Sequence, residues 1–227
     1  MLEKNIKIVW DKISNACFKC GRNVSELRLI AVSKTQPSDL ILEAIKLGLN
    51  NFGENKAQEL KQKAEQINFD VIWHFIGHLQ TNKVKYIINH AEFIHSVDSI
   101  KLAEEINSKA EKINKRQKIL LEVKTSEEES KFGLQSENDV FNLLEFCKSK
   151  ANIEVVGLMT MAPFTDNEKI IRKSFSSLRL LKEKINSFGY NLTELSMGMT
   201  NDFEIAIEEG STMLRIGTAI FGERNYN

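Results

Sequence analysis

The chain has 227 residues and 42% of them are hydrophobic, so it can bury a sizeable core within the length of one α/β domain. Its 31 basic and 31 acidic residues balance to zero net charge, which leaves no basic field for a nucleic-acid backbone. No apolar run reaches membrane-spanning length, and the charged, amphipathic N-terminus lacks a signal-peptide core. We therefore expect a cytoplasmic protein with neither nucleic-acid nor membrane partners.

Apolar strand-like runs alternate with amphipathic helix-like runs along the chain. A first helix is predicted over residues 1–21, ending near Gly21. Strands are predicted at 27–34, 50–55, 71–77, 93–99, 118–125, 155–162, 194–199 and 213–222. Helices are predicted between them at 37–48, 56–67, 81–91, 100–113, 136–150, 167–187 and 201–210. In the last of these, Asn201 and Glu204 have the spacing of a capping box.

This alternation favours a parallel sheet, and eight such units in a chain of this length favour a closed barrel over an open sheet. Only two prolines occur, and no stretch rich in Gly, Pro or Ser separates one part of the chain from another. We therefore predict an α/β fold, a (β/α)8 TIM barrel with an extra N-terminal helix, as a single domain over residues 1–227.

The three cysteines do not suggest a disulfide framework, because their number is odd and small. Cys17 and Cys20 have C-x-x-C spacing, but no second Cys or His pair accompanies them, and we interpret them as two thiols on a helix. His74 and His78 are four residues apart, which suits a metal on a helix and not on the strand predicted here. We predict no metal site.

The stretch "LIAVSKT" is an apolar strand that ends on Lys34. In a barrel of this kind the active face lies at the C-terminal ends of the strands, so Lys34 is expected at the mouth. An amine partly removed from water there loses some preference for its charged form and can form a Schiff base with a carbonyl. The alternative is a solvated lysine at the start of a loop.

Strands seven and eight end in residues suited to a phosphate. Thr200 follows "MGM", and "RIGT" places Gly217 and Thr218 after Arg215. The loops after these strands are the common phosphate site of the fold, where a glycine admits the anion and hydroxyl groups donate to it. Each residue alone could be a helix cap or a tight turn. Together with Lys34 they suit pyridoxal 5'-phosphate (PLP).

Seven motifs, in this order along the chain, carry a resemblance to a known family: "AVSKT", "NFGENKAQE", "WHFIGHLQTNK", "HSVDS", "GLMTMAP", "LSMGMTNDFEIAI" and "STMLRIGTAIFG". From about residue 27 to residue 222 the sequence resembles the YggS/PROSC family of PLP homeostasis proteins. The resemblance implies the barrel of the alanine racemase N-terminal domain, with PLP held on the lysine of the first motif.

Carried over residue by residue, the resemblance implies that Lys34 holds the aldehyde as a Schiff base. It implies that Thr200, Gly217 and Thr218 bind the phosphate and that Arg215 lies beside the ring nitrogen. Many relatives have Ser at the position of Thr200, and the hydroxyl donor is kept here.

Three further residues, Asn55, His74 and Met159, fall at or near strand ends and are candidates to line the cofactor. A histidine packed inside a strand is the alternative for His74. Lys131, after strand five, is a candidate second amine for handing PLP over, or else a lysine in a charged loop.

The donor-only Arg215 favours an unprotonated ring nitrogen and so weakens PLP as an electron sink. Alanine racemases also use a tyrosine from a separate β-domain, and we expect no such domain here. Tyr86, Tyr190 and Tyr226 do not fall at strand ends. We therefore predict a monomeric PLP carrier or regulator in intracellular PLP homeostasis, with apo PLP-dependent enzymes as candidate recipients, and no catalysed reaction.

Two enzymatic alternatives stay open. A PLP-dependent amino-acid racemase would use the same barrel, lysine and phosphate site. A Schiff-base aldolase acting on a phosphosugar would also use them, but nothing in that chemistry calls for Arg215 just ahead of the phosphate loop.

Overall fold

Eight parallel strands close into a barrel in the computed structural model, which describes residues 1–126 and 132–223. Each strand pairs with the next along the chain, and β8 pairs with β1. The strands are β1 Arg28–Val32, β2 Asn51–Glu54, β3 Ile72–Phe75, β4 Ala91–Val97, β5 Gln117–Glu122, β6 Ile153–Met159, β7 Glu194–Ser196 and β8 Met213–Ile216. The predicted (β/α)8 barrel is confirmed.

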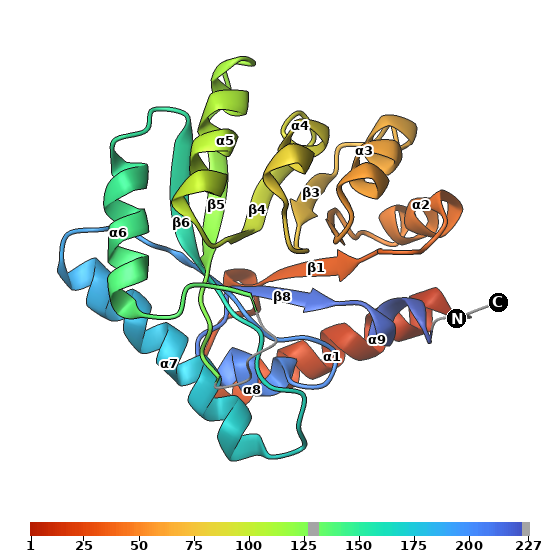
Figure 1. Ribbon diagram of the computed structural model, residues 1–227. Helices are drawn as coiled ribbons and strands as arrows, with labels where there is room; N and C mark the ends of the chain where they lie inside the picture. The colour runs from red at the N-terminus through yellow and green to blue at the C-terminus, as the bar shows by residue number, and fades with distance from the viewer. Residues whose placement is uncertain (127–131, 224–227) are drawn as a thin grey trace.

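Helices connect the strands on the outside of the barrel (Figure 1). They are α1 Leu2–Cys20, α2 Ser38–Lys46, α3 Ala57–Gln66, α4 Val84–Ile87, α5 Ile100–Glu111, α6 Glu137–Lys148, α7 Glu168–Ser187, α8 Phe203–Glu208 and α9 Thr218–Phe221, with 3₁₀ turns at Val24–Glu26 and Thr81–Lys83. The extra helix α1 packs against α8 and α9, so the first and last parts of the described chain lie together.

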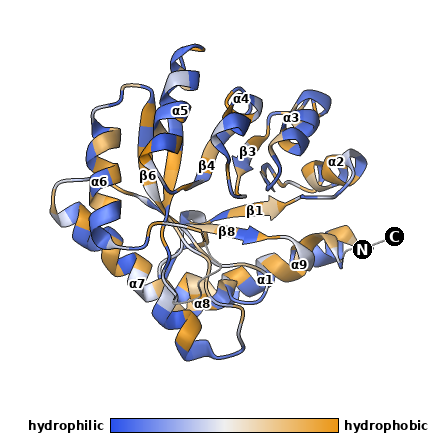
Figure 2. Ribbon diagram, viewed as in Figure 1, coloured by the Kyte–Doolittle hydropathy of each residue, from blue (hydrophilic) through white to orange (hydrophobic). Residues whose placement is uncertain are grey.

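Hydrophobic and hydrophilic residues alternate along the longer helices (Figure 2), and their buried residues recur every three or four positions, as in an amphipathic helix. Local signals set several of their ends. The α6 helix begins with a capping box, in which Ser136 and Asp139 each bond the other's backbone N–H. The α1 helix ends where Gly21 adopts φ 70°, a left-handed conformation that favours glycine, as the sequence predicted.

Some predicted boundaries differ from the structure near the C-terminus. Strand eight ends at Ile216, because the carbonyl of Gly217 already accepts from Ile220 and Phe221 and starts the short helix α9. The predicted capping box at Asn201 is wrong. Asp202 is the residue before α8, and its carboxylate accepts from the backbone N–H of Met199 at 2.5 Å.

The predicted helix at 81–91 is also shorter in the structure. A 3₁₀ turn at Thr81–Lys83 leads into a single α-helical turn, and β4 begins at Ala91. The Lys115 ammonium donates to the carbonyl of Ile88, just after that turn, and to the carbonyl of Ala91, the first residue of β4.

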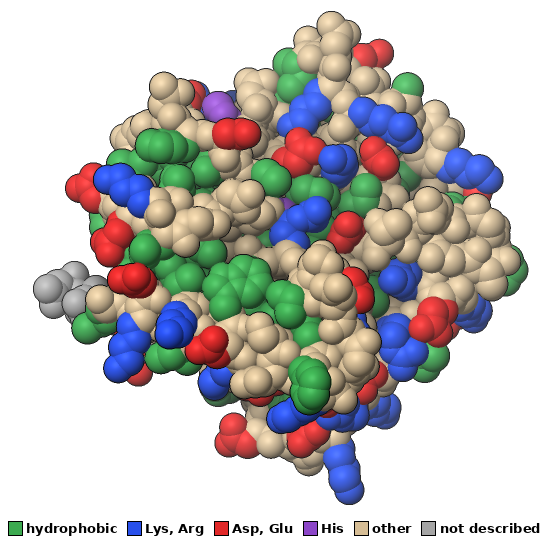
Figure 3. Space-filling view, turned by 180° about the vertical axis from the view of Figure 1, so that it is seen from behind, with side chains coloured by type: hydrophobic (Ala, Val, Ile, Leu, Met, Phe, Trp, Pro, Cys, Tyr) green, Lys and Arg blue, Asp and Glu red, His purple; other side chains and the backbone are tan. Residues whose placement is uncertain are grey.

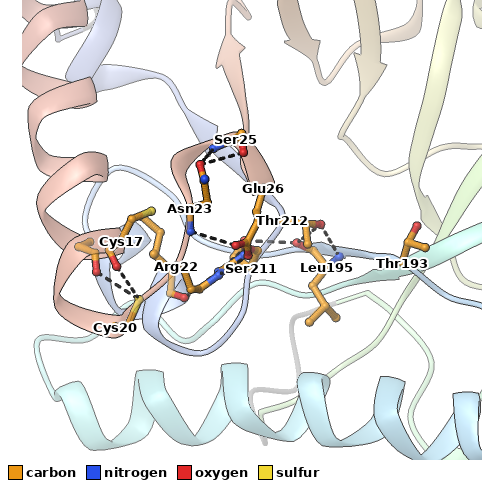
Figure 4. Close-up of polar contacts among 12 residues, drawn as sticks. Cys17, Cys20, Arg22, Asn23, Ser25, Glu26, Thr193, Leu195, Ser211 and Thr212 are labelled. Carbon is orange, nitrogen blue, oxygen red and sulfur yellow. Dashed lines mark hydrogen bonds and ion pairs between the residues drawn. The ribbon is translucent and has the colours of Figure 1, made fainter.

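The C-x-x-C pair lies on the last turn of α1, as the sequence suggested. The Cys17 side chain is buried in the core, and burial raises the pKa of its thiol. The Cys20 thiol donates to main-chain carbonyls of its own helix, at 3.2 Å and 3.5 Å (Figure 4). Both thiols are therefore part of the helix packing.

Side chains inside the barrel follow the two-residue period of the strands. Along β8, Met213 and Arg215 point inward, and Gly217 follows in the same phase at the mouth. Met213 packs in a small apolar cluster inside the barrel with Ile30, Phe93, Leu120 and Met159. Buried polar side chains lie beside this cluster in the barrel: the His74 ring stacks on Phe93, and Ser196 pairs with Met213 in the sheet register.

Charged side chains of both signs are interspersed over the face of the molecule shown in Figure 3, with apolar patches among them. This pattern agrees with the balanced composition of the chain. Within residues 1–126 and 132–223, no helix combines the length and the hydropathy that a membrane crossing needs.

Candidate functional site

A cavity of about 710 Å³ opens at the C-terminal ends of the strands. Residues at or just after the ends of seven strands contribute to its wall: Val32, Asn55, Ile76, Glu122, Met161, Met199 and Gly217. The cavity therefore lies where (β/α)8 barrels carry their active sites. It brings together six of the eight residues predicted from the sequence: Lys34, Asn55, Thr200, Arg215, Gly217 and Thr218.

Lys34 is half-buried in a tight turn directly after β1. The backbone N–H of Gln36 donates to the Ser33 carbonyl at 3.0 Å, so Lys34 and Thr35 are the two central residues of the turn. Thr35 has φ 67°, an uncommon value for a residue other than glycine. Its backbone N–H donates to a carboxylate oxygen of Glu59 on α3 at 2.6 Å, which holds the turn in this shape.

A cluster of three charged side chains, Lys63, Glu54 and Glu59, supports this turn. The Lys63 ammonium on α3 donates to the Ser33 carbonyl at 2.7 Å and to the Glu54 and Glu59 carboxylates at 2.8 Å and 2.7 Å. The Ser33 hydroxyl also donates to Glu54, at 2.6 Å. The sequence analysis does not predict this cluster, although all three charged residues lie in the stretch "NFGENKAQELKQK".

The cluster shifts the pKa of both carboxyls. Burial raises the pKa of Glu54, and the Lys63 ammonium opposes part of the rise. Burial also acts to raise the pKa of Glu59, but its hydrogen bonds from Lys63 and from the Thr35 backbone outweigh that effect, and the pKa lies below its usual value. The network therefore keeps Glu59 charged next to the Lys34 turn.

Arg215 lies across the floor of the cavity and is almost fully buried. It donates to the Ser196 hydroxyl on β7 at 2.5 Å and to the Thr160 carbonyl after β6 at 2.9 Å. Burial lowers its pKa to about 10, while the carboxyls of Asp202 and Glu122 act in the other direction. Arg215 therefore remains a cation at neutral pH and can only donate hydrogen bonds.

The ends of β7 and β8 form the part of the wall next to the end of β1. The Thr200 hydroxyl accepts from the Ala219 backbone N–H at 3.4 Å, which places it against the first turn of α9 beside Thr218. A Cβ atom on Gly217 would lie 3.3 Å from both Cβ and the carbonyl oxygen of Val32. Glycine at this position thus lets the ends of β8 and β1 approach closely, which brings Lys34 near the hydroxyl residues.

Two buried polar atoms on the cavity wall lack a hydrogen-bond partner among the described residues: Oδ1 of Asn55 and Oε2 of Glu122. Burial, with a smaller contribution from the Asp98 carboxyl, raises the pKa of Glu122 to about 7, and Arg215 opposes part of the rise. Buried polar groups in proteins are nearly always paired, so these two are suited to a polar ligand. Glu122 is not among the residues predicted from the sequence, although it lies within the strand predicted at 118–125.

The structure does not place His74 or Met159 on the cavity wall. Both lie one layer deeper in the barrel interior, and the residues two positions further along the same strands, Ile76 and Met161, line the cavity instead. His74 is hydrogen-bonded to Asn51 and His95. The predicted strands overlap the observed ones, but periodicity along the sequence does not give the depth of each side chain in the barrel.

The remaining sequence candidates lie elsewhere. Tyr86 is on α4, and the Tyr190 hydroxyl donates to Glu145, so neither tyrosine lines the cavity. His78 lies at the cavity rim and stacks on Phe132, with ring centroids 3.8 Å apart. Lys131 and Tyr226 lie outside the described residues. In the described part of the chain, no three His, Cys, Asp or Glu side chains are grouped as a metal would require.

Comparisons with known proteins agree with this geometry. The family model for the alanine racemase N-terminal domain matches residues 17–225. A pyridoxal phosphate homeostasis protein of Aquifex aeolicus is 44% identical over 220 residues, covering 96% of each chain. The human pyridoxal phosphate homeostasis protein is 37% identical over 238 residues, covering 98% of this chain and 86% of its own.

A solved structure of PipY from Synechococcus elongatus, with PLP bound, superposes with a TM-score of 0.86 at 30% identity, covering 98% of this chain and 100% of that one. These matches cover 96–98% of this chain. The chain thus belongs to the alanine racemase N-terminal domain family and, within it, to the pyridoxal phosphate homeostasis proteins.

Proposed function

We propose that this protein binds PLP in the cavity, holds it on Lys34 as a Schiff base, and acts in PLP homeostasis as a carrier that supplies or buffers the cofactor. The observation that carries the proposal is that Lys34, Arg215 and the two threonines Thr200 and Thr218 all line one cavity. Relatives named as PLP homeostasis proteins and the PLP-bound PipY structure support it. The proposal treats the chain as one PLP-binding domain.

The residues on the cavity wall fit the chemical groups of PLP. Lys34 supplies the amine for the aldehyde. Thr200, Gly217 and Thr218 supply hydroxyl groups and a close backbone approach for the phosphate. Arg215 supplies a fixed donor for the ring nitrogen. The unpartnered oxygens of Asn55 and Glu122 are left for the remaining polar groups of the ligand.

Bound PLP supplies an electron sink, which is strongest when its ring nitrogen is protonated. Arg215 donates to that nitrogen and cannot accept from it, so the protein holds the ring in its weaker state. No tyrosine among the described residues lines the cavity to act as a second acid or base. We therefore propose a carrier with no catalysed reaction.

A racemase-like enzyme is the second candidate, and one observation favours it. Glu122 lines the cavity with a pKa of about 7, which suits a general acid or base at neutral pH. Assays for interconversion of L- and D-amino acids by the PLP-loaded protein decide between the two candidates. Turnover that disappears in Glu122→Gln would support the enzyme.

The near-visible absorption spectrum with added PLP tests the attachment point. We expect a Schiff-base band in the wild type that is lost in Lys34→Ala and retained in Lys101→Ala, whose lysine is exposed on α5. Borohydride reduction followed by peptide mapping should place the PLP adduct on Lys34. A wild type without a band would refute PLP binding. A band that survives in Lys34→Ala would move the attachment to another amine, with Lys131 the next to substitute.

The same proposal includes a cytoplasmic location, a monomeric state, and apo PLP-dependent enzymes as recipients of the cofactor. These three statements rest on the sequence and on the homeostasis names of the relatives. A carrier of this kind has to release PLP, and the half-buried Lys34 lines the cavity from a turn directly after β1.

A further inference from the structure

A chain of hydrogen bonds runs through the barrel interior beneath the cavity floor. Arg215 donates to Ser196 at 2.5 Å, and the Ser196 hydroxyl lies 2.8 Å from Nδ1 of His95. Nε2 of His95 lies 2.9 Å from Nδ1 of His74, whose Nε2 lies 3.0 Å from Oδ1 of Asn51. The five residues come from strands β8, β7, β4, β3 and β2, and all are buried.

The lower end of the chain sets the hydrogen of His74. Nδ2 of Asn51 donates to Oδ1 of Asn50 at 2.7 Å, so the amide oxygen of Asn51 is the atom that faces His74. An oxygen can only accept, and therefore Nε2 of His74 carries a hydrogen. In a neutral imidazole Nδ1 is then an acceptor, and His95 donates to it from Nε2.

The Arg215 end of the chain is compatible with the same direction of donation. Arg215 can only donate, so the Ser196 oxygen accepts from it and the hydroxyl hydrogen remains available for Nδ1 of His95. This hydrogen matches the lower end of the chain, which leaves Nδ1 of the neutral His95 as an acceptor and Nε2 as the donor. Because the two ends agree, every donor in the chain points away from Arg215.

The surroundings keep both imidazoles uncharged. Each ring is fully buried, and burial lowers the pKa of both well below the usual value. The charged groups that act on the pair are the cations Arg28 and Arg215, which lower the pKa further. Phe93 stacks on His74 with ring centroids 4.8 Å apart and closes the remaining side.

We propose that Ser196 and His95 are positioning residues for Arg215: this one-directional chain fixes the guanidinium beneath the cavity, with His74 and Asn51 as its far anchor. The inference deepens the proposed function, since it rests on Arg215 facing the PLP ring nitrogen. The chain is not a proton relay, because reversal would require the amide oxygen of Asn51 to donate a hydrogen bond to His74. Its role is to keep a flexible side chain in one orientation before the ligand arrives.

The first test uses the wild-type protein without PLP. We expect imidazole ¹⁵N NMR to show two histidines in the neutral Nε2–H form that do not titrate between about pH 5 and 8, the range in which an ordinary histidine changes charge. Substitution of His78 and of His90, one at a time, identifies the signals of the other two. A buried histidine that titrates in this range, or that carries its hydrogen on Nδ1, would overturn the proposal.

The second test measures PLP binding and the pH dependence of its absorption band in Ser196→Ala and Ser196→Thr. Loss of the acceptor leaves Arg215 with the Thr160 carbonyl alone, so Ser196→Ala should weaken PLP binding about tenfold. Its band should also change with pH, because the ring nitrogen is no longer held unprotonated. Ser196→Thr keeps the hydroxyl and should restore both properties.

The outcomes separate this proposal from the proposed function. Unchanged affinity and an unchanged band in a folded Ser196→Ala protein would overturn the positioning role while PLP binding stands. A wild type that binds no PLP would overturn the proposed function and, with it, the role of the chain toward the cofactor, even where NMR finds both expected tautomers.

Discussion

Glu122 ends β5 inside the cavity with a carboxyl group that the fold shields from water. Its Oε2 has no partner among the described residues, and burial raises its pKa from 4.5 to about 7. Arg215 is close enough to oppose the rise but not to cancel it. The ionised carboxylate of Glu122 therefore destabilises the folded protein without ligand. Buried titratable groups of this kind are common at functional sites.

Stability without PLP should depend on pH through this residue. Below about pH 4.5 Glu122 is protonated in both the folded and unfolded chains, and its burial has no electrostatic penalty. As the pH rises to about 7, the unfolded chain ionises first, so stability is lost over this window. Glu122→Gln should therefore raise the free energy of unfolding by about 3 kcal/mol at pH 8 and change it little at pH 4.

Urea unfolding of both proteins at the two pH values measures this difference. Glu43→Gln, an exposed substitution on α2, is the matched control and should show no such pH dependence. An equal effect of Glu122→Gln at both pH values would contradict the electrostatic cause.

At the scale of elements, α3 packs on β2 and also holds the turn after β1. Lys63 reaches from α3 to the Ser33 carbonyl, and Glu59 on the same helix holds the Thr35 backbone N–H. The turn that presents Lys34 is thus fixed by side chains of the neighbouring helix and by Glu54 at the end of β2. A loop held in this way stays ordered despite the unfavourable backbone conformation of Thr35.

Lys63→Ala should destabilise the protein by about 3–5 kcal/mol, because it leaves the buried Glu54 carboxylate uncompensated. PLP binding should weaken as well, since the Lys34 turn loses its support. Lys61→Ala on the same helix is the control. Its lysine side chain is 44% exposed and 3.7 Å from Glu65, and its loss should change stability by less than about 0.5 kcal/mol. Similar losses in the two variants, measured by denaturant unfolding and PLP titration, would refute the role of the cluster.

At the scale of the whole molecule, the barrel closes by pairing β8 with β1, and α1 then packs on α8 and α9. Arg22, just after α1, donates to the carbonyls of Ile207 and Ser211 at 2.9 Å and 2.8 Å (Figure 4). These contacts join residues more than 180 positions apart in the sequence. The N-terminal helix therefore stabilises the strands that carry Arg215 and the phosphate wall.

Arg22→Ala should lower the free energy of unfolding by about 1–3 kcal/mol, because two partly buried carbonyls lose a charged donor. Arg116→Ala is the comparison, since that side chain is 67% exposed and 4.0 Å from Glu154, and its loss should cost less than about 0.5 kcal/mol. Thermal and urea unfolding of both variants give the values. A neutral Arg22→Ala would show that α1 is held by its apolar face alone.

Local patterns were sufficient for much of this protein. The alternation of apolar strands and amphipathic helices led to the eight-stranded barrel, because that alternation reflects short-range periodicity and the burial of parallel strands. Lys34, Arg215 and Gly217 were found from the same information, since parallel strands of a barrel all end at one face. Thr200 and Thr218 followed because each comes directly after such an end.

The depth of a side chain in the barrel and its hydrogen-bond partners could be determined only from the folded structure. His74 and Met159 were predicted to line the cavity, but they lie one layer below it, because strand tilt and register set the height of each side chain in the barrel. The partners Ser196 and His95 lie 101 positions apart and meet only when β4 and β7 face each other inside the closed barrel. Periodicity along one strand predicts which way a side chain points, and the position of the other strands determines what it contacts.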